Sequence, residues 1–239
     1  SIYKMWYTGW DYDGHSRIGY ATSPDGISWT KYVNNPVIDH GPGGSWYEVG
    51  PEITTVLKAD DGLYHAWFHG RDKDGITSVG YAISYNGINW TLCASNPVLA
   101  SDPLVPWRSA HLNDPSVMYD NGVYKMWVVG SDADYTAGQV GYATSQDGEN
   151  WTLDPRSPIF WGDPGTWEEG TLDNARVLNE GVLYRMWYSG DQSHIGYATS
   201  SDGIHWIKYT GNPVMRTGMT GEWGQPVVKF VEGSDGSVL

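Results

Sequence analysis

Carboxylates and amides recur at matching points in four segments of the chain, and these side chains could do chemistry. The segments are YEVGPEITTV (47–56), HLNDPSVMY (111–119), GTLDNARVL (170–178) and GQPVVKFV (224–231). Their alignment places at one position Gly50, Asp114, Asp173 and Gln225, with Glu48 and Glu52 flanking it in the first segment. Acids gathered at one site can divide into a general base and a general acid, because mutual repulsion and burial separate their pKa values. Hydrolysis of a glycosidic bond needs such a pair.

These segments belong to a repeat that runs through the whole chain. YKMWYTG (3–9) recurs as YHAWFHG (64–70), YKMWVVG (124–130) and YRMWYSG (184–190), with tryptophans spaced by 61, 60 and 60 residues. Each copy is followed by a Gly-Tyr step, a nine-residue phrase such as ATSPDGISW (21–29), a proline and another tryptophan. Five landmarks in a constant order indicate a structural repeat whose units begin near residues 3, 64, 124 and 184.

Each unit has the pattern of four short antiparallel strands. Alternating runs such as YKMWVVG and VGYATS are separated by turn signals such as DNG and QDGEN, and no helical period is present. Four-stranded units in series predict an all-β protein, a β-propeller with four blades in a single domain spanning 1–239. The stretch GEWGQPVVKFVEGSDGSVL (221–239) reads as the linker and first strand of a further repeat, whereas the chain begins at a second strand. We expect that last strand to pair with the first blade and close the ring.

Hairpin direction sorts the loops onto two faces. Tight Asp-Gly, Asn-Gly and Glu-Gly turns fall on one face, where their glycines must adopt positive φ: Gly26, Gly62, Gly87, Gly122, Gly148, Gly181 and Gly203. Long polar loops fall on the opposite face, and such loops on a rigid scaffold usually carry function. We therefore expect the site near the axis on the second face, where the first strand of each blade begins.

Composition excludes several classes of protein. The net charge is −14 and only 14 basic residues are present, scattered along the chain, which argues against nucleic acid as a partner. No apolar run approaches 18 residues, so no membrane-spanning helix is expected. Cys93 is the only cysteine, which excludes an internal disulfide. The chain has no initiator methionine, and we expect a fragment lacking any signal peptide, with a secreted or periplasmic location slightly favoured.

The repeat YKMWYTG…IGYATSPDGISW…NPV…W resembles the β-propeller glycosidase superfamily, which includes glycoside hydrolase families 32, 43, 62, 68, 117 and 130. The resemblance covers nearly the whole chain and implies activity on furanosides, xylosides or mannosides. HLNDPSVMY looks like the family segment in which Asn-Asp-Pro carries the catalytic aspartate, which implies a nucleophile or general-base role for Asp114. The same resemblance implies that Asp173 tunes pKa or binds substrate.

The chain departs from this family in two ways. The family's general acid is a glutamate on the next blade, where this sequence has Gln225, with Glu222 three residues earlier. Glu48, in EVGP, is similar to the family's Glu-Gly-Pro acid motif but lies in the repeat on the other side of Asp114. The family has five blades, whereas four are counted here. The proton donor is therefore expected to be Glu48 or Glu222.

Other polar and aromatic residues are candidates for substrate contact or for purely structural roles. Aromatic rings can stack on sugars through their apolar faces or can close a blade. The candidates for substrate binding are Trp10, Glu52, Trp107, Arg108, His111, Tyr135 and Gln225. The blade tryptophans Trp6, Trp67, Trp127 and Trp187 are expected in the core. The phrase ATSPDGISW resembles the Asp-box of sialidases, a hairpin whose aspartate braces its own turn.

No cofactor is required by this chemistry, and a structural calcium ion is the one metal that the sequence suggests. Asp-x-Asp pairs begin at Asp11, Asp72 and Asp132, and carboxylate oxygens suit calcium, although solvated loop acids explain the pairs equally. Two functions remain open. The first is a glycoside hydrolase acting on an oligo- or polysaccharide. The second is a non-catalytic propeller that binds glycan or protein, and for either we expect a monomer.

Overall fold

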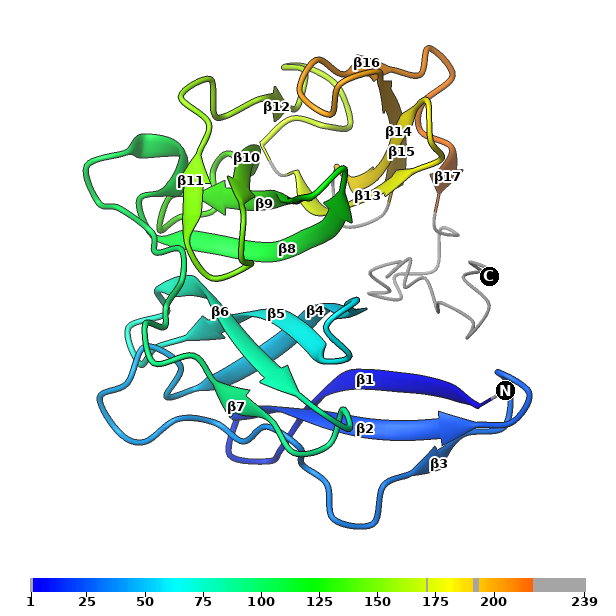
Figure 1. The fold of residues 1–239 in the computed structure, drawn as a ribbon. Coiled ribbons are helices and arrows are strands. Elements are labelled where there is room, and N and C mark those ends of the chain that lie inside the picture. Colours follow the sequence, from blue (N-terminus) through cyan, green and yellow to red (C-terminus); the bar gives the residue numbers. More distant parts are fainter. Residues whose placement is uncertain (1, 171, 191–193, 217–239) are drawn as a thin grey trace. The chain divides into compact units, whose positions relative to one another are not determined.

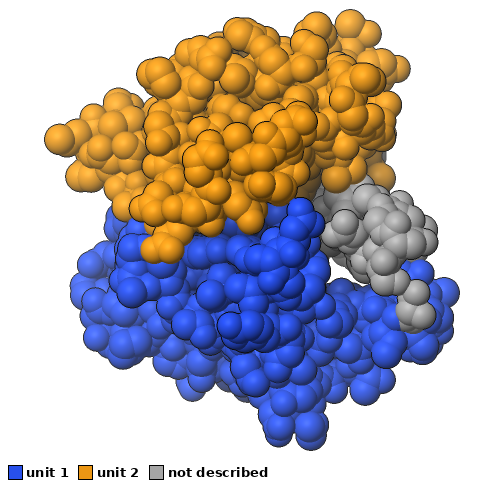
Figure 2. All heavy atoms as spheres, in the orientation of Figure 1, with its two compact units in different colours: residues 1–97, 229–239 blue, residues 98–228 orange. Residues whose placement is uncertain are grey.

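The computed structural model describes residues 2–170, 172–190 and 194–216. They form two compact units, one built on residues 1–97 and the other on residues 98–228 (Figure 2). Each unit carries two of the four repeats as short antiparallel sheets, which Figure 1 shows in chain order from blue to orange. The only helical element in the described residues is a 3-10 turn, η1 (Pro106–Arg108). The described residues thus contain no helix long and apolar enough to cross a membrane.

The first unit contains blades 1 and 2. Blade 1 consists of β1 (Tyr3–Trp10), β2 (Ser16–Ser23) and β3 (Thr30–Lys31). Blade 2 consists of β4 (Gly50–Lys58), β5 (Tyr64–Arg71), β6 (Thr77–Ser84) and β7 (Thr91–Leu92). In both sheets the strands pair in chain order and antiparallel.

The second unit contains blades 3 and 4. Blade 3 consists of β8 (His111–Asp120), β9 (Val123–Ser131), β10 (Gln139–Ser145), β11 (Trp151–Leu153) and β12 (Phe160–Trp161). Blade 4 consists of β13 (Asp173–Asn179), β14 (Tyr184–Ser189), β15 (His194–Ser200), β16 (Ile207–Lys208) and β17 (Met215–Arg216). The short strands β12 and β17 pair with β10 and β15, alongside β11 and β16, so the outermost strand of each blade is interrupted by a loop.

The all-β, four-blade prediction is confirmed. The predicted positive φ is present at all seven turn glycines, with values from 77° at Gly87 to 89° at Gly181. The predicted closure of the ring by the C-terminal strand falls on residues 217–239, outside the described residues.

The repeated nine-residue phrase is a self-braced hairpin. In blade 3, the Oδ1 atom of Asp147 accepts hydrogen bonds from the amides of Glu149 and Asn150, and Ser145 Oγ accepts one from Gly148. The same contacts surround Asp25, Asn86 and Asp202 in the other blades. The phrase therefore recurs because each copy satisfies the backbone of one tight turn.

Within each unit, a blade tryptophan reaches the hairpin of the next blade. Trp6 Nε1 donates to the carbonyl oxygen of Gly87 at 2.6 Å, and Trp127 Nε1 donates to that of Gly203 at 2.7 Å. A Cβ atom on Gly87 would lie 2.5 Å from the Trp6 ring, and one on Gly203 2.8 Å from Trp127. Of the four tryptophans expected in the core, Trp67 and Trp127 are fully buried, whereas Trp6 and Trp187 are only partly buried. At Trp6 and Trp127 the packing includes a polar contact between neighbouring blades.

The linker tryptophans fill a space that two strands leave open by carrying glycine; we call this space the glycine slot of a blade. Trp46 lies against Gly70 and Gly80 of blade 2, and Trp107 lies against Gly130 and Gly141 of blade 3. Cβ atoms on these glycines would lie 2.3–2.6 Å from the nearest indole atoms. In blade 4, Trp167 occupies the same place against Gly190. Each indole therefore fits only where the strand has no side chain.

The hairpin aspartates should make folding sensitive to acid. Amide donors, first that of Ser28, lower the pKa of Asp25 to about 2. Hydrogen bonds from Asn150 likewise lower the pKa of Asp147, and those from His205 lower the pKa of Asp202 against the opposing effect of burial. Carboxylates with a folded-state pKa below the unfolded value of about 4 add stability above that pH, and this is lost as pH falls toward 2.

We predict that replacing these three aspartates by asparagine will flatten the fall in stability between pH 4 and pH 2, because Asn86 makes the same amide contacts without titrating. Urea unfolding at pH 5, 4, 3 and 2 measures this. Asp60→Asn, at an exposed turn, is the matched control and should keep the acid dependence of the original chain. An unchanged acid dependence in the triple variant would show that the hairpins do not cause it.

Candidate functional site

The first strands of blades 2, 3 and 4 each carry a bulge of one residue near their start. The register shifts between Ile53 and Thr55, between Asn113 and Ser116, and between Asp173 and Arg176. Such bulges bend a strand and re-aim the side chains around them, and they are frequent beside functional sites.

The pairing partners correct the predicted alignment of these strands. Glu52, Asn113 and Asp173 each pair with the residue two positions after the blade tryptophan, namely His69, Val129 and Ser189. Gly50 instead pairs four positions after that tryptophan, as His111 does. The predicted equivalence of Gly50, Asp114 and Asp173 is therefore wrong: Asp173 lies level with Asn113 and Glu52, and Asp114 lies level with Asn174.

Asp114 and Asn174 have a backbone conformation that most residues avoid. Their φ angles are 52° and 49°, in the left-handed region where aspartate and asparagine are better tolerated than other side chains. A non-glycine residue held there costs on the order of 1–3 kcal/mol and persists only when its surroundings fix it. Asp114 is thus a strained residue within the bulge of β8.

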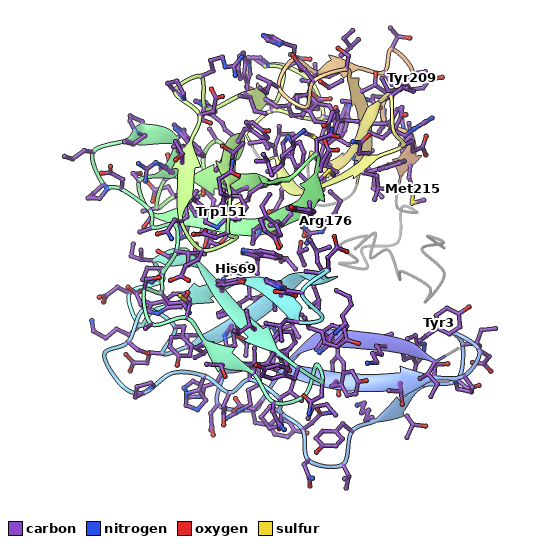
Figure 3. All side chains as sticks on the ribbon, in the orientation of Figure 1. Tyr3, His69, Trp151, Arg176, Tyr209 and Met215 are labelled. Carbon is purple, nitrogen blue, oxygen red and sulfur yellow. The ribbon has the colours of Figure 1, made fainter. Side chains whose placement is uncertain are left out.

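Arg176 is the side chain that fixes Asp114. It lies buried on β13, where Figure 3 labels it, and its Nη1 donates to the main-chain oxygen of Asp114 at 3.0 Å. Its Nη2 lies 3.4 Å from Asp114 Oδ1. One guanidinium therefore holds both the backbone and the carboxylate of Asp114, a two-point contact that suits its planar fork of donors.

Arg176 was missed in the sequence, although a signal was present. In GTLDNARVL it is the one cation, and its neighbours Ala175, Val177 and Leu178 are apolar. A buried strand tolerates such a charge only when a partner is supplied. At the equivalent positions blades 2 and 3 have Thr55 and Ser116, and the Ser116 hydroxyl accepts a hydrogen bond from the amide of Val177.

Asp173 begins β13 and is partly buried. Its Oδ1 accepts a hydrogen bond from the amide of Asn174 at 3.0 Å, and its main-chain oxygen accepts one from the Ser189 hydroxyl. In the other unit, Glu52 lies at the same strand level, with its Oε1 3.5 Å from Nε2 of the buried His69. Both acids thus lie at the start of a first strand, as predicted.

Glu48 has a contact that recurs elsewhere in the chain. Its Oε2 accepts a hydrogen bond from the amide of Gly44 at 2.7 Å, and Oε2 of Glu169 accepts one from Gly165 at 2.8 Å. Each carboxylate thus braces a glycine turn in the linker before a blade. This repetition supports a structural role for Glu48, and its predicted role as proton donor stays a prediction. Glu222 and Gln225 lie outside the described residues.

Glu168 is the one acidic residue among the buried side chains of the described ranges. Its Oε1 accepts a hydrogen bond from the Tyr188 hydroxyl at 2.6 Å, and Lys208 Nζ contacts its Oε2. Burial and this carboxylate raise the pKa of Tyr188. Both carboxylate oxygens of Glu168 are therefore occupied by contacts that hold the linker of blade 4 in place. These contacts explain the buried charge by a structural role.

His111 and Tyr135 form a stacked pair in blade 3. Their ring centroids are 4.0 Å apart and the planes are inclined by 15°. His111 is buried, while 44% of Tyr135 is exposed, so one face of the tyrosine ring rests on the imidazole. This geometry is compatible with stacking of a sugar on the tyrosine, which remains a prediction.

Trp107 and Arg108 lie in the linker of the same blade. Trp107 is only 8% exposed, and its packing in the glycine slot accounts for the ring without a ligand. Arg108 donates from Nη1 to the Ala100 oxygen and from Nη2 to Asp102 Oδ2 at 3.2 Å, so it ties the linker together. Trp10, in the other unit, is 52% exposed, with the Arg71 guanidinium 6.0 Å from its ring centroid.

The described residues hold no group of three or more His, Cys, Asp or Glu suited to a metal ion. In the Asp-x-Asp loops, the first aspartate accepts amide hydrogen bonds from its own loop: Asp11 from Asp13 and His15, Asp72 from Asp74 and Ile76, and Asp132 from Thr136. These contacts account for the pairs as loop braces. Structural calcium stays a prediction.

Comparison with known proteins gives the fold a family context. The profile described as "Glycosyl hydrolases family 32 N-terminal domain" matches residues 54–168. An uncharacterised protein of Mycobacterium tuberculosis is 27% identical over 219 residues, which are 86% of this chain and 71% of that protein.

Two solved structures share the fold. Fructan 1-exohydrolase IIa of Cichorium intybus has a TM-score of 0.70 at 18% identity, covering 91% of this chain and 43% of that one. A thermostable family-43 glycoside hydrolase has a TM-score of 0.66 at 20% identity, covering 92% of this chain and 72% of that one. The chain thus spans less than half of the fructan exohydrolase. These likenesses show that the chain shares the β-propeller fold of these glycoside hydrolases, as the repeat predicted.

The packing of Trp107 yields a prediction. Trp107→Ala should lower the free energy of unfolding by about 3–5 kcal/mol, because it empties a space that Gly130 and Gly141 cannot fill. Urea unfolding at neutral pH measures the loss. Trp161→Ala is the matched control, because Trp161 is 54% exposed, and it should change stability little. Unchanged stability of Trp107→Ala with weakened binding of oligosaccharide would instead favour the sugar-stacking role.

Proposed function

Because the chain has the fold of the β-propeller glycosidase superfamily, we propose that it hydrolyses glycosidic bonds in an oligo- or polysaccharide. The substrate class is a furanoside, xyloside or mannoside, in line with the resemblance of the repeat. Asp114 acts as general base or nucleophile, and Asp173 binds substrate or tunes the reacting groups. Glu48 or Glu222 supplies the proton to the leaving oxygen.

The observation that carries this proposal is the way in which the backbone and a neighbouring arginine fix Asp114. Asp114 has a positive φ within a bulge of its strand. A buried arginine from the next blade contacts both its carboxylate and its main chain. Strain of this kind clusters at active sites, because a reacting group must be fixed before substrate arrives. A capping role alone does not require a second buried charge to be brought to the same residue.

A second function is favoured by another observation. Glu48 braces the Gly44 turn just as Glu169 braces the Gly165 turn, which gives one candidate proton donor a structural task. Gln225 stands where the family has its acid. If Glu222 also fails as a donor, the same face binds glycan or protein without turnover.

The test is hydrolysis of a panel of aryl-glycosides, arabinan, xylan, mannan and fructans. We predict that Asp114→Asn will lower the rate on any accepted substrate by about 10²–10⁴-fold, because the amide cannot act as base or nucleophile. Asp60→Asn, at an exposed turn, should retain full activity. If the original chain binds a sugar but does not hydrolyse it, the non-catalytic function is the correct one. Equal rates for Asp114→Asn and the original chain would remove Asp114 from the mechanism.

We also predict that Arg176→Lys will lower kcat by about 100-fold with little change in KM, because an ammonium cannot replace the two-point contact with Asp114. The split between kcat and KM separates positioning from substrate binding. A circular dichroism spectrum like that of the original chain verifies that the variant is folded. A larger fall for Arg176→Met than for Arg176→Lys is expected, since only lysine retains the charge. Unchanged kcat in both variants would contradict the positioning role.

A further inference from the structure

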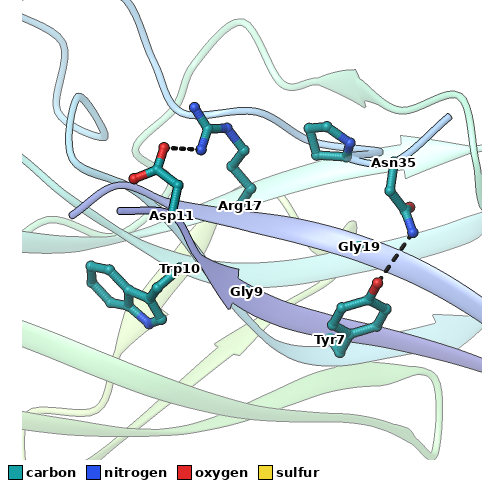
Figure 4. A pocket seen from close by; sticks show the side chains of 8 residues that line it. Tyr7, Gly9, Trp10, Asp11, Arg17, Gly19 and Asn35 are labelled. Carbon is teal, nitrogen blue, oxygen red and sulfur yellow. Dashed lines mark hydrogen bonds and ion pairs between the residues drawn. The ribbon is translucent and has the colours of Figure 1, made fainter. Parts of the chain in front are cut away.

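Three loops of the chain share one backbone pattern. They join β1 to β2, β5 to β6 and β9 to β10, and they begin at Asp11, Asp72 and Asp132. In each loop the aspartate Oδ1 accepts a hydrogen bond at 2.9 Å from the amide four residues later. The main-chain oxygen of the same aspartate accepts one at 3.1–3.3 Å from the amide three residues later. Figure 4 shows the first of these residues, Asp11, with its ion pair to Arg17. The three loops are therefore equivalent, residue by residue, through this turn.

The residue three positions after each aspartate has a left-handed backbone. It is Gly14 in blade 1 and Gly75 in blade 2, with φ angles of 83° and 85°, but Tyr135 in blade 3, with a φ of 53°. A Cβ atom on either glycine would meet nothing within 4 Å, so the turn favours glycine for its φ and not for lack of space. A bulky side chain at such a φ is strained. Blade 3 thus has a tyrosine where the same turn has glycine in the other two blades.

The Tyr135 ring has a fixed orientation. Its stack on His111 leaves 44% of the tyrosine exposed, although the imidazole is buried. The Tyr135 hydroxyl lies 3.3 Å from His111 Nδ1, so the ring is held at its polar end as well as across one face. An aromatic ring that only fills space is normally buried. This ring instead presents apolar surface to solvent at a conformational cost, and we call Tyr135 with its supporting His111 the tyrosine platform.

The loop that carries the tyrosine platform is anchored beside the start of β13. The amide of Gly138 donates to the main-chain oxygen of Gly170 at 3.2 Å. A Cβ atom on Gly138 would lie 2.0 Å from the main-chain oxygen of Leu172, the residue before Asp173, so the two segments are in direct contact. The platform and the start of β13 thus belong to one packed region of the second unit.

The platform also lies close to Asp114 along β8. His111 and Asn113 are two residues apart, so their side chains project from the same face of the strand. Asn113 is level with Asp173, and Asp114 follows it in the bulge. At most about 10 Å of chain separates His111 from Asp114, so one extended ligand can contact both. Because the level of Asn113 and Asp173 lies between these contacts, a sugar stacked on the platform is not the sugar whose bond Asp114 attacks.

We propose that Tyr135 stacks on a non-reacting sugar of the substrate, so that the ligand is an uncharged oligosaccharide of two or more sugars. The CH groups on one face of a sugar ring can pack on the exposed aromatic surface. Asp132 and Asp134, in the same loop, repel an anionic sugar. The role of Asp114 in this inference rests on the proposed function, whereas the platform rests on the geometry of Tyr135 and His111.

This contact gives the strain at Tyr135 a function. Binding energy from a part of the substrate that does not react can hold the reacting bond in place. A glycine at this position relieves the strain but supplies no ring. The tyrosine therefore makes the site selective for longer substrates, because a monosaccharide cannot contact the platform and Asp114 together.

The test is isothermal titration calorimetry with arabino-, xylo-, manno- and fructo-oligosaccharides, from monosaccharide to pentasaccharide. All variants are made in the full chain with Asp114→Asn, so that no ligand is consumed. Tyr135→Gly restores the residue that blades 1 and 2 have, and so removes the ring without disturbing the turn. We expect it to raise the Kd of the oligosaccharides that bind by about tenfold, and to leave the Kd of the monosaccharide unchanged.

Matched controls make the result specific. Tyr135→Phe keeps the ring and should keep each Kd within about twofold, because stacking does not need the hydroxyl. Tyr12→Ala removes a fully exposed tyrosine from the equivalent loop of blade 1 and should leave every Kd unchanged. Oligogalacturonate, which has a carboxylate on each sugar, should bind more weakly than the uncharged oligosaccharides. A circular dichroism spectrum like that of the original chain verifies that each variant is folded.

The outcomes separate this inference from the proposed function. Equal Kd values for Tyr135→Gly and its parent with every oligosaccharide would overturn the platform, and an equal loss in Tyr135→Phe would overturn stacking. Tighter binding of oligogalacturonate would overturn the assignment to an uncharged sugar. Binding that depends on Tyr135 in a chain that hydrolyses none of these sugars would keep the platform and refute hydrolysis. Hydrolysis that depends on Asp114, with binding independent of Tyr135, would do the reverse.

Discussion

The blades of this protein depend on one steric constraint: an indole packs only where the opposing strand has no Cβ atom. The constraint appears in the linkers, where Trp46, Trp107 and Trp167 press on strand glycines, and again where Trp6 and Trp127 meet the hairpin glycines Gly87 and Gly203. The indole nitrogens of Trp6 and Trp127 also bond those hairpins. Because a methyl group at any of these glycines would overlap a ring, the tryptophans and glycines must be retained together.

Much of this architecture could be predicted from the sequence, because the repeated residues are of types that suit one local structure better than others. Repeated tryptophans, Gly-Tyr steps and Asp-Gly turns recur at fixed spacing, and each has a local physical reason that does not need distant partners. The division of the outermost strand was not predicted. The segments β12 and β17 are two residues long, too short to leave an alternating pattern, and their pairing with β10 and β15 is a tertiary contact.

The site was predicted less well, and the reason is specific. Alignment by residue type put Asp114 and Asp173 at one position, whereas the pairing partners place Asp114 level with Asn174 and Asp173 level with Asn113. Because β8 and β13 carry the same bulge, the 60-residue spacing of the blade tryptophans already gives the observed match, and pairing the two aspartates by residue type overrode it. Arg176 was missed for a different reason, since its importance comes from a contact with a residue 62 positions earlier in the chain.

The bulge also divides each first strand into a part whose side chains can vary and a part whose side chains are fixed by packing. Side chains alternate between the faces of a strand, so one extra residue reverses the alternation on one side relative to the other. Glu52, Asn113 and Asp173 lie before the bulge and differ in charge and length, whereas the residues after it pair with the blade tryptophans. Substitution at the loop end of a strand is thereby insulated from the packing behind it. The residue at the loop end of a strand can therefore change in charge and length while the packing behind the bulge stays the same.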